Sequence, residues 1–221
     1  MQIIPAKTPD FVKTLFPNFV WNINTENKEL YLTFDDGPTP EITDWVLQTL
    51  EEYNAKVTFF CIGNNIEKHP DIFLNVLSQG HTIGNHTYNH LKGWKHKTNV
   101  YVEDVEKTQT LINSKFVNHQ SQIINLFRPP YGKFKNKQSK ALLTLGYRVI
   151  LWDVLSYDWD NSVSEETCFN NVISAAKRGS IIVFHDSVKA SRNLKYTLPK
   201  VLEHYNKQGY EFKSLTKRIL E

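Results

Sequence analysis

The segments ELYLTF (29–34), EITDWVLQTLEEY (41–53) and AKVTFFCI (55–62) follow one another closely and decide the fold class of this chain. The first and third are short apolar runs rich in aromatic and β-branched residues, which is typical of buried strands. The middle segment places apolar residues at the spacing of one helical face: Ile42, Trp45, Val46, Leu50 and Tyr53. A strand, a helix and a second strand in this order predict a parallel pair of strands.

The same alternation continues to the end of the chain. Further strands are predicted at HTIGN (81–85), QIINLF (122–127), YRVILWDV (147–154), SIIVF (180–184) and YEFKSL (210–215). Helices are predicted at 71–80 after Pro70, from Thr98 through Leu111, at 136–145, from Ser164 to Gly179 and at 193–207. Seven strand–helix units without a linker-like stretch predict an α/β fold whose parallel sheet closes into a barrel.

Residues 29–221 are predicted to form one domain, because 221 residues with 40% hydrophobic content support one sizeable core. Residues 1–28 lack the alternation and are expected to form an irregular N-terminal cap, held by Phe16, Phe19 and Trp21. The two cysteines lie in apolar or helical segments, so neither a disulfide framework nor a thiolate metal site is predicted. We expect a monomer.

The net charge of +3 comes from 26 Lys and Arg against 23 Asp and Glu spread along the chain, which does not indicate nucleic-acid binding. Lysines do gather locally at 92–97 and at 133–137. A solvated surface is the simpler interpretation of this bias, and a rim that attracts an anionic polymer is the alternative. No apolar run suits a membrane span and no export signal is visible, so the sequence alone indicates a cytoplasmic protein.

Polar residues that do not suit a core follow the predicted strands at one end. In chain order they are Asp35, Asp36, His86, His90, Arg128 and His185. The carboxyl ends of the strands of an α/β barrel meet at one mouth. We therefore expect these side chains to converge there.

Two of the motifs indicate a metal site. TFDDGP (33–38) places two carboxylates side by side, where their repulsion favours a nearby cation, although an Asp-rich surface turn is an equally good interpretation of this motif alone. In HTYNH (86–90) two histidines stand four residues apart, close enough to share an ion. Together they offer a His₂Asp set with open positions for water, which suits catalytic zinc and also non-haem iron.

At these residues the chain resembles the polysaccharide deacetylase family, carbohydrate esterase family 4, with its NodB homology domain. TFDDGP (33–38) matches the first motif of the family without change, HTYNH (86–90) fits the second, RPPY (128–131) the third and VFH (183–185) the fifth. The resemblance runs from about residue 29 to 215. It implies a distorted (β/α) barrel of about seven strands. The activity that it implies is removal of N-acetyl, or O-acetyl, groups from an acetylated glycan of the N-acetylglucosamine type.

The resemblance also implies a role for each motif residue. Asp35 is the expected catalytic base, oriented by Arg128, and His185 is the expected general acid. The backbone N–H of Tyr131 is expected to help bind the oxyanion. One divalent metal ion is implied, with zinc as the first expectation and cobalt, nickel or iron as alternatives. Its expected ligands are Asp36, His86 and His90.

The fourth motif departs from the family pattern. An Asp usually stands four residues before the Trp, whereas WDVLSYDW (152–159) has Leu155 there. That Asp normally helps to set the pKa of the acid histidine. Its loss predicts a lower pKa for His185 than in other family members, unless Asp153 or Asp158 replaces it.

Aromatic side chains near the motifs are candidates for stacking on sugar rings. They are Tyr131, Tyr157, Trp159 and Trp94, with packing as the favoured alternative role for Trp159 and also for Trp152. Two other functions stay open. A related amidohydrolase acting on a small amide or ureido substrate would need a closed pocket. A non-catalytic carbohydrate-binding relative would have no reason to keep Asp35, Arg128 and His185 together.

Overall fold

Strands in the described part of the chain form one parallel sheet of eight. The computed structural model describes residues 5–115 and 125–220. The strands are β1 (Glu29–Asp35), β2 (Thr58–Cys61), β3 (Thr82–Asn85), β4 (Leu126–Phe127), β5 (Arg148–Val149), β6 (Val154–Leu155), β7 (Ile181–His185) and β8 (Glu211–Phe212). Their pairings are all parallel, as the alternation of strands and helices predicts.

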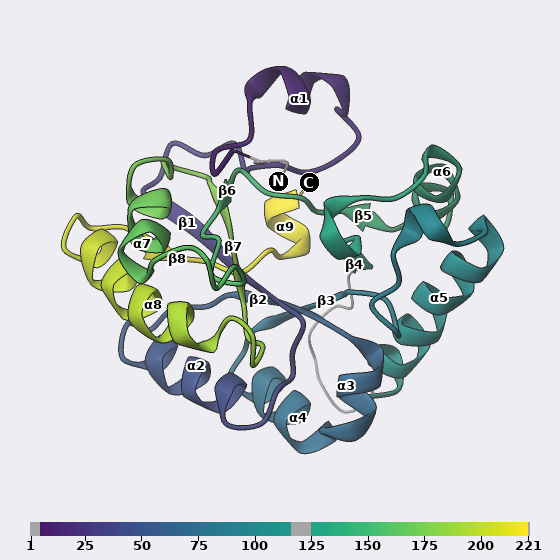
Figure 1. Ribbon diagram of the computed structural model, residues 1–221, viewed down its shortest axis with the longest axis horizontal. Helices are drawn as coiled ribbons and strands as arrows, with labels where there is room; N and C mark the ends of the chain where they lie inside the picture. The colour runs from purple at the N-terminus through teal and green to yellow at the C-terminus, as the bar shows by residue number, and fades with distance from the viewer. Residues whose placement is uncertain (1–4, 116–124, 221) are drawn as a thin grey trace.

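Most of the helices lie on the outer side of this sheet (Figure 1). The α-helices are α1 (Asp10–Leu15), α2 (Ile42–Glu51), α3 (Gly63–Lys68), α4 (Pro70–Ser78), α5 (Thr98–Lys115), α6 (Asn136–Thr144), α7 (Glu165–Ile173), α8 (Ser191–Asn206) and α9 (Lys217–Leu220). Two short 3₁₀ helices, η1 (Gly93–Lys95) and η2 (Pro130–Gly132), lie in loops. No helix in these ranges combines the length and apolar character that a membrane span needs.

The sheet curls until its two edges are close. Its strand order is β5-β4-β3-β2-β1-β7-β6, and β8 pairs with β1 outside this path. The edge strands β5 and β6 are separated by only residues 150–153, so they lie within about 17 Å of each other along the chain. This geometry confirms the distorted barrel of about seven strands.

The N-terminal segment, residues 5–28, lies along the seam between these edges. Lys7 bridges to Val154 and Asn22 to Ser180 in antiparallel fashion, and Val20 bridges to Ile150 in parallel. The expectation of an irregular cap was incomplete, because the segment contains α1 and bonds to the sheet. Its aromatic residues do contact one another: Phe16 and Phe19 stack at 5.7 Å, and the Trp21 indole donates to the Phe16 carbonyl.

Alternate residues of β1 face different cores. Leu30, Leu32 and Phe34 belong to the outer core between the sheet and its helices. Tyr31 belongs to an inner core with Phe60, Leu126, Ile150, Ile181 and Leu215, against which Ile219 and Leu220 also pack. Figure 1 shows α9 within the ring of strands. Since side chains alternate along a strand, Thr33 and Asp35 share the inner face with Tyr31. The apolar filling of the barrel therefore lies next to the carboxyl end, where the polar residues gather.

Several predicted elements differ from the observed ones. The single strand predicted at 147–154 is two strands, because its backbone changes partners along residues 150–153. The Ile150 N–H bonds to Phe127 of β4, the Leu151 N–H to Val20 of the N-terminal segment and the Asp153 N–H to Ile181 of β7. YEFKSL forms only the two residues of β8, and α3 was not predicted. Residues 122–124 of the predicted QIINLF strand lie outside the described residues.

Candidate active site

The polar residues that follow the strands converge at one end of the barrel. A pocket of about 330 Å³ is lined there by Asp35, Asp36, His86, His90, Tyr131, Gly132, Trp152, Leu155, Trp159, Val183, His185, Ser187 and Lys189. Asp35 and His185 are register partners on the neighbouring strands β1 and β7. Arg128 lies beneath the pocket and is fully buried.

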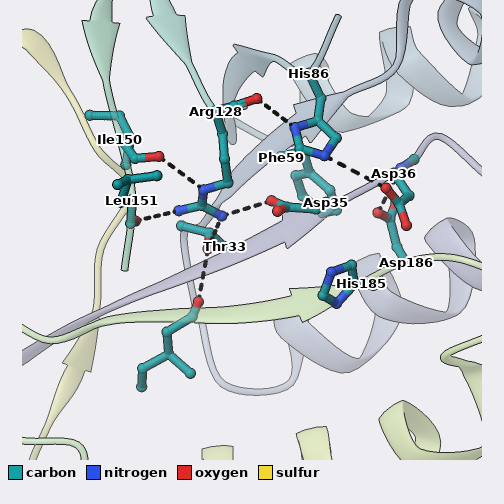
Figure 2. Close-up of polar contacts among 12 residues, drawn as sticks. Thr33, Asp35, Asp36, Phe59, His86, Arg128, Ile150, Leu151, His185 and Asp186 are labelled. Atoms are coloured by element: carbon teal, nitrogen blue, oxygen red, sulfur yellow. Dashed lines mark hydrogen bonds and ion pairs between the residues drawn. The ribbon is translucent and has the colours of Figure 1, made fainter. Parts of the chain in front are cut away.

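The Arg128 guanidinium holds Asp35 in place (Figure 2). Its Nη1 donates to the Asp35 carboxylate and to the Thr33 hydroxyl, both at 2.7 Å. Its Nε and Nη2 donate to the carbonyls of Ile150 and Leu151 at 3.2 and 2.9 Å. The orientation of this carboxylate is therefore fixed by a cation that is itself bonded on several sides.

Asp35 is held in its ionised form. Burial alone would raise the pKa of this carboxyl, but the positive charge of Arg128, with His86 and His185, holds its pKa below the usual value. An ionised carboxylate directed at the pocket is able to accept a proton at neutral pH.

Asp36, His86 and His90 form a candidate metal site. Each offers one ligand atom, and these atoms lie within 4.8 Å of one another. The Asp36 carboxylate is 3.7 Å from the His86 Nε2 and 3.3 Å from the His90 Nε2. Ligands of a tetrahedral zinc ion with bonds of about 2.1 Å are separated by about 3.4 Å, so the donor set fits such an ion.

The histidines are in the form that a metal requires. The Nδ1 of His86 donates to the Arg128 carbonyl at 2.8 Å, which leaves the Nε2 lone pair directed at Asp36. Burial lowers the pKa of His86, and burial together with His86 lowers the pKa of His90 to about 4. Both rings are therefore neutral at pH 7, as metal ligation demands.

Backbone geometry at the first motif is specific to its sequence. Asp36 has a positive φ of 83°. Its carboxylate lies near His86 and His90, whereas the Asp35 carboxylate is bonded to Arg128. The buried Asp186 accepts hydrogen bonds from the Gly37 N–H at 3.0 Å and from the Thr43 hydroxyl at 2.6 Å. A Cβ at Gly37 would lie 2.0 Å from the Asp186 carboxylate, so only glycine fits there.

The second motif is fixed by helix α5. The Asp104 carboxylate accepts hydrogen bonds from the backbone N–H groups of Tyr88 and Asn89 at 2.7 and 3.0 Å, and from the Asn89 amide at 2.6 Å. These contacts hold the loop between the two histidines, in which Thr87 and His90 have positive φ values of 66° and 53°. A buried acceptor thus stabilises a backbone that side chains other than glycine rarely adopt.

His185 has a carboxylate partner although Leu155 replaces the family Asp. Asp158 contacts the His185 Nδ1 at 2.8 Å and accepts its backbone N–H at 2.7 Å. Burial opposes protonation, yet the negative charges of Asp158, Asp36 and Asp35 raise the pKa of His185 to about 9. The exception stated with the expectation for Leu155 therefore applies, because Asp158 is the carboxylate partner of His185.

Asp153 is not the carboxylate partner of His185. Its carboxylate is instead bound by Lys7 at 2.5 Å, by Lys13 at 2.6 Å and by the Ser180 hydroxyl at 2.5 Å. These bonds join the N-terminal segment to the barrel. Asp153 is thus a structural anchor.

The candidate sugar-stacking residues divide into two groups. Tyr131 and Trp159 line the pocket, and the Trp159 ring lies 4.9 Å from His185. Tyr157 and Trp94 are not among the lining residues: Tyr157 stacks on Trp159 at 4.7 Å, and Trp94 lies 5.5 Å from Tyr131. Trp152, for which packing was the favoured role, does line the pocket.

Tyr131 has the geometry for a free backbone donor. Its φ is 61°, and none of the hydrogen bonds among described residues uses its N–H. The Tyr131 ring is 52% exposed and lies 4.8 Å from His90. The Tyr131 N–H is therefore unpaired among the described residues, and the Tyr131 ring lies beside the candidate metal ligand His90.

Sequence reasoning missed the supporting residues Thr33, Asp104 and Asp186. Asp186 follows His185 directly, so a second carboxylate next to a motif histidine was a visible signal. Thr33 stands two residues before Asp35 on the inner face of a strand, which was also recognisable. Asp104 lies on a long helix with no motif, and nothing in its local sequence indicates its partner.

Carboxylates, imidazoles and a candidate metal triad meet at the mouth of this α/β barrel. This arrangement is typical of hydrolytic enzymes. A sequence model described as polysaccharide deacetylase matches residues 22–150. A peptidoglycan-N-acetylglucosamine deacetylase of Bacillus cereus is 35% identical over 201 residues, which cover 90% of this chain and 92% of that protein. The peptidoglycan-N-acetylmuramic acid deacetylase PdaA of Bacillus subtilis is 29% identical over 201 residues, covering 90% and 74%.

Solved structures agree with these sequence matches. A crystal structure of a peptidoglycan N-acetylglucosamine deacetylase in complex with 4-naphthalen-1-yl-N-oxidanyl-benzamide matches with a TM-score of 0.83 at 31% identity, covering 94% of this chain and 95% of that one. The chain belongs to the polysaccharide deacetylase family, and it is an enzyme of that family.

Proposed function

We propose that this enzyme is a zinc-dependent N-deacetylase that acts on N-acetylglucosamine residues of peptidoglycan. The observation that carries the proposal is the convergence of three units in one pocket. They are the Arg128-bound Asp35, the Asp158-bound His185, and the metal triad of Asp36, His86 and His90. The relatives named as peptidoglycan deacetylases support the choice of substrate.

Amide hydrolysis needs an activated water, a stabilised oxyanion and a proton for the departing nitrogen. Asp36, His86 and His90 would hold a divalent cation, which would polarise the acetyl carbonyl as a Lewis acid and lower the pKa of a bound water. Asp35 is placed to accept the proton of that water, because Arg128 keeps it ionised and oriented. The Tyr131 N–H is available to the oxyanion, a contribution that is typically worth about 3 kcal/mol.

His185 is placed to protonate the departing nitrogen. Its Nδ1 is occupied by Asp158, so Nε2 is the nitrogen that remains for the pocket. With a pKa raised to about 9, the ring carries a proton at neutral pH and is able to act as an acid. In each turnover Asp35 accepts one proton from the water and His185 donates one to the nitrogen, so the two residues together neither gain nor lose a proton.

The alternatives are less well supported. A non-catalytic sugar-binding protein would not require a buried Arg128 guanidinium that bonds to Asp35. It would also not require the His185 imidazole to be oriented by Asp158. A pocket lined by Tyr131, Trp152 and Trp159 suits a pyranose ring. Neither observation suggests a small ureido substrate.

A substrate panel tests the proposal. The protein is stripped of metal with a chelator and reloaded with zinc. Acetate release is measured from N-acetylglucosamine oligomers, peptidoglycan strands and acetylated xylan, and ammonia release is measured from a small ureido compound. We expect acetate from the first two substrates with reloaded protein and none from the stripped protein. Hydrolysis of the ureido compound alone would contradict the proposal.

Two further expectations are measurable in the same study. Peptidoglycan lies outside the cytoplasm, whereas the sequence alone indicated a cytoplasmic protein, so cell fractionation decides between these predictions. The expected monomer is checked by light scattering of the purified protein.

A further inference from the structure

Two loops beside the pocket, one running into the first turn of α5 and the other into the start of α6, carry lysines and no acidic residues. Segment 91–100 contains three lysines and segment 129–140 contains four, without any Asp or Glu in either. The chain has 26 Lys and Arg against 23 Asp and Glu, so the remainder of the chain holds more acidic than basic side chains. The net positive charge of the protein therefore originates in these two loops.

The two loops form one surface. The Lys135 Nζ donates to the His96 carbonyl at 2.7 Å, and the Gln138 amide donates to the Gly93 carbonyl at 2.9 Å. Their lysines are exposed, and we call them the lysine rim. Its members are Lys92, Lys95, Lys97, Lys133, Lys135, Lys137 and Lys140.

The lysine rim adjoins the pocket through aromatic rings. The Lys92 Nζ lies 5.3 Å from the ring of Tyr131, which lines the pocket. The Lys133 Nζ lies 5.3 Å from the ring of Trp94, which in turn lies 5.5 Å from Tyr131. An ammonium group beside an exposed aromatic face is suited to a sugar ring that carries an acidic substituent. Lys189 adds another cation as a lining residue of the pocket.

The charges of the rim are not neutralised by the protein itself. The ion pairs of the described lysines involve Lys7, Lys13, Lys207 and Lys213, and none of the rim lysines. Seven exposed cations without carboxylate partners produce a positive field over the surface next to the pocket. A polymer with one sugar in the pocket passes its neighbouring sugars across this field.

We propose that the lysine rim binds carboxylates on the sugars next to the one that is deacetylated. The preferred substrate is then a glycan in which N-acetylglucosamine alternates with an amino sugar that carries a free carboxylate. This inference rests on the proposed deacetylase function and adds a feature that selects acidic over neutral glycans.

A comparison of two tetrasaccharides tests the inference. One alternates N-acetylglucosamine with N-acetylmuramic acid, which carries a lactyl carboxylate, and the other is the neutral N-acetylglucosamine tetramer. The zinc-loaded Lys92→Gln/Lys133→Gln variant is compared with wild type. Lys28→Gln/Lys56→Gln is the matched control, because it removes two charges just before β1 and β2, at the opposite end of the strands.

We expect the rim variant to lower the ratio of kcat/KM for the acidic over the neutral substrate by about 5-fold at low salt, since each exposed charge pair contributes modestly. The control should leave this ratio unchanged. In wild type the ratio should fall as salt is raised toward about 0.5 M, where screening is strong.

An equal loss on both substrates, or a ratio of one in wild type, would overturn the inference while leaving the deacetylase function intact. If wild-type protein released acetate from neither substrate, the proposed function itself would instead be refuted.

Discussion

His185 is the residue whose chemistry depends most on one neighbour. Asp158 contacts its Nδ1 and, after the opposing effect of burial, is the main cause of its raised pKa of about 9. As a general acid the ring must be protonated, so activity should persist up to its pKa and fall at higher pH. The width of the pH profile on the alkaline side therefore reports on Asp158.

We predict that Asp158→Asn moves the alkaline limb of kcat/KM to lower pH by about 1 unit or more, because the negative charge that favours the imidazolium is lost. A bound divalent cation lowers the pKa of His185 in both proteins, so the difference between the two profiles is the quantity to measure. Leu155→Asp is the control and should not move the limb upward, since Asp158 already occupies Nδ1. A limb that stays in place in Asp158→Asn would show that His185 is not the acid.

The motif residues were readable from the sequence, whereas the partner of His185 was not. Asp153 and Asp158 both flank Leu155, and only the path of the chain separates them. Tyr157 has a φ of 68°, which turns the backbone so that Asp158 reaches His185. A conformation that disfavours most side chains is not indicated by local propensity.

At the scale of elements, helix α5 supports the loop of residues 86–90, which carries the candidate metal ligands His86 and His90. Asp104 is the contact that joins them, through two backbone N–H groups and one side-chain amide. None of these bonds involves His86 or His90, so Asp104 positions the two histidines through the backbone between them.

We predict that Asp104→Asn weakens zinc binding about 10- to 100-fold, the usual effect of losing a group that orients metal ligands. Affinity is measured by chelator competition, and circular dichroism checks that the barrel is folded. Glu106→Gln, an exposed change on the same helix, serves as the control. Equal zinc affinity in the two variants would refute the positioning role of Asp104.

Long elements were predicted better than short ones. β1 and α8 carry clear periodicity and appear close to their expected bounds. β4, β5, β6 and β8 have two residues each, too few to show a period of two. The strand predicted at 147–154 has an apolar centre, Val149 to Trp152, that crosses the seam between the two edges. An apolar run does not reveal which partner its backbone bonds to.

At the scale of the whole molecule, the N-terminal segment closes the barrel. Thr8 and Val20 bond to the backbone of residues 149–153, and the Arg128 guanidinium bonds to carbonyls of the same stretch. The segment and the active site thus share one support. The sequence did not indicate this, because residues 1–28 show no periodicity. The boundary at residue 28 stays a prediction.

We predict that Lys7→Met/Lys13→Met lowers the free energy of unfolding by about 3 kcal/mol at pH 7, because it leaves the buried Asp153 carboxylate without a cation. Burial would raise the pKa of Asp153, but Lys13, Lys7 and Ser180 hold it below the usual value. This contribution to stability is therefore present above pH 4 or so and is lost as the pH falls through the depressed pKa, so the variant and wild type should converge in acid.

Urea denaturation at pH 7 measures this effect. Lys207→Met/Lys213→Met is the control, since each lysine forms an exposed ion pair that contributes little to stability. Adding Asp153→Asn to the first variant should restore part of the lost stability by removing the unpaired charge. A loss no greater than that of the control would contradict the anchoring role of Asp153.

The most direct test of the account is a paired measurement on Asp35→Asn, because the central claim separates the residue that accepts a proton from the residues that hold the metal. Zinc content is determined by elemental analysis, and acetate release from N-acetylglucosamine oligomers is measured on the same sample. We predict one zinc per chain, as in wild type, with turnover reduced by a factor of about 10² to 10⁴. Loss of zinc in parallel with activity, or turnover that remains near wild type, would contradict the assignment of Asp35 as the base beside an Asp36, His86 and His90 metal site.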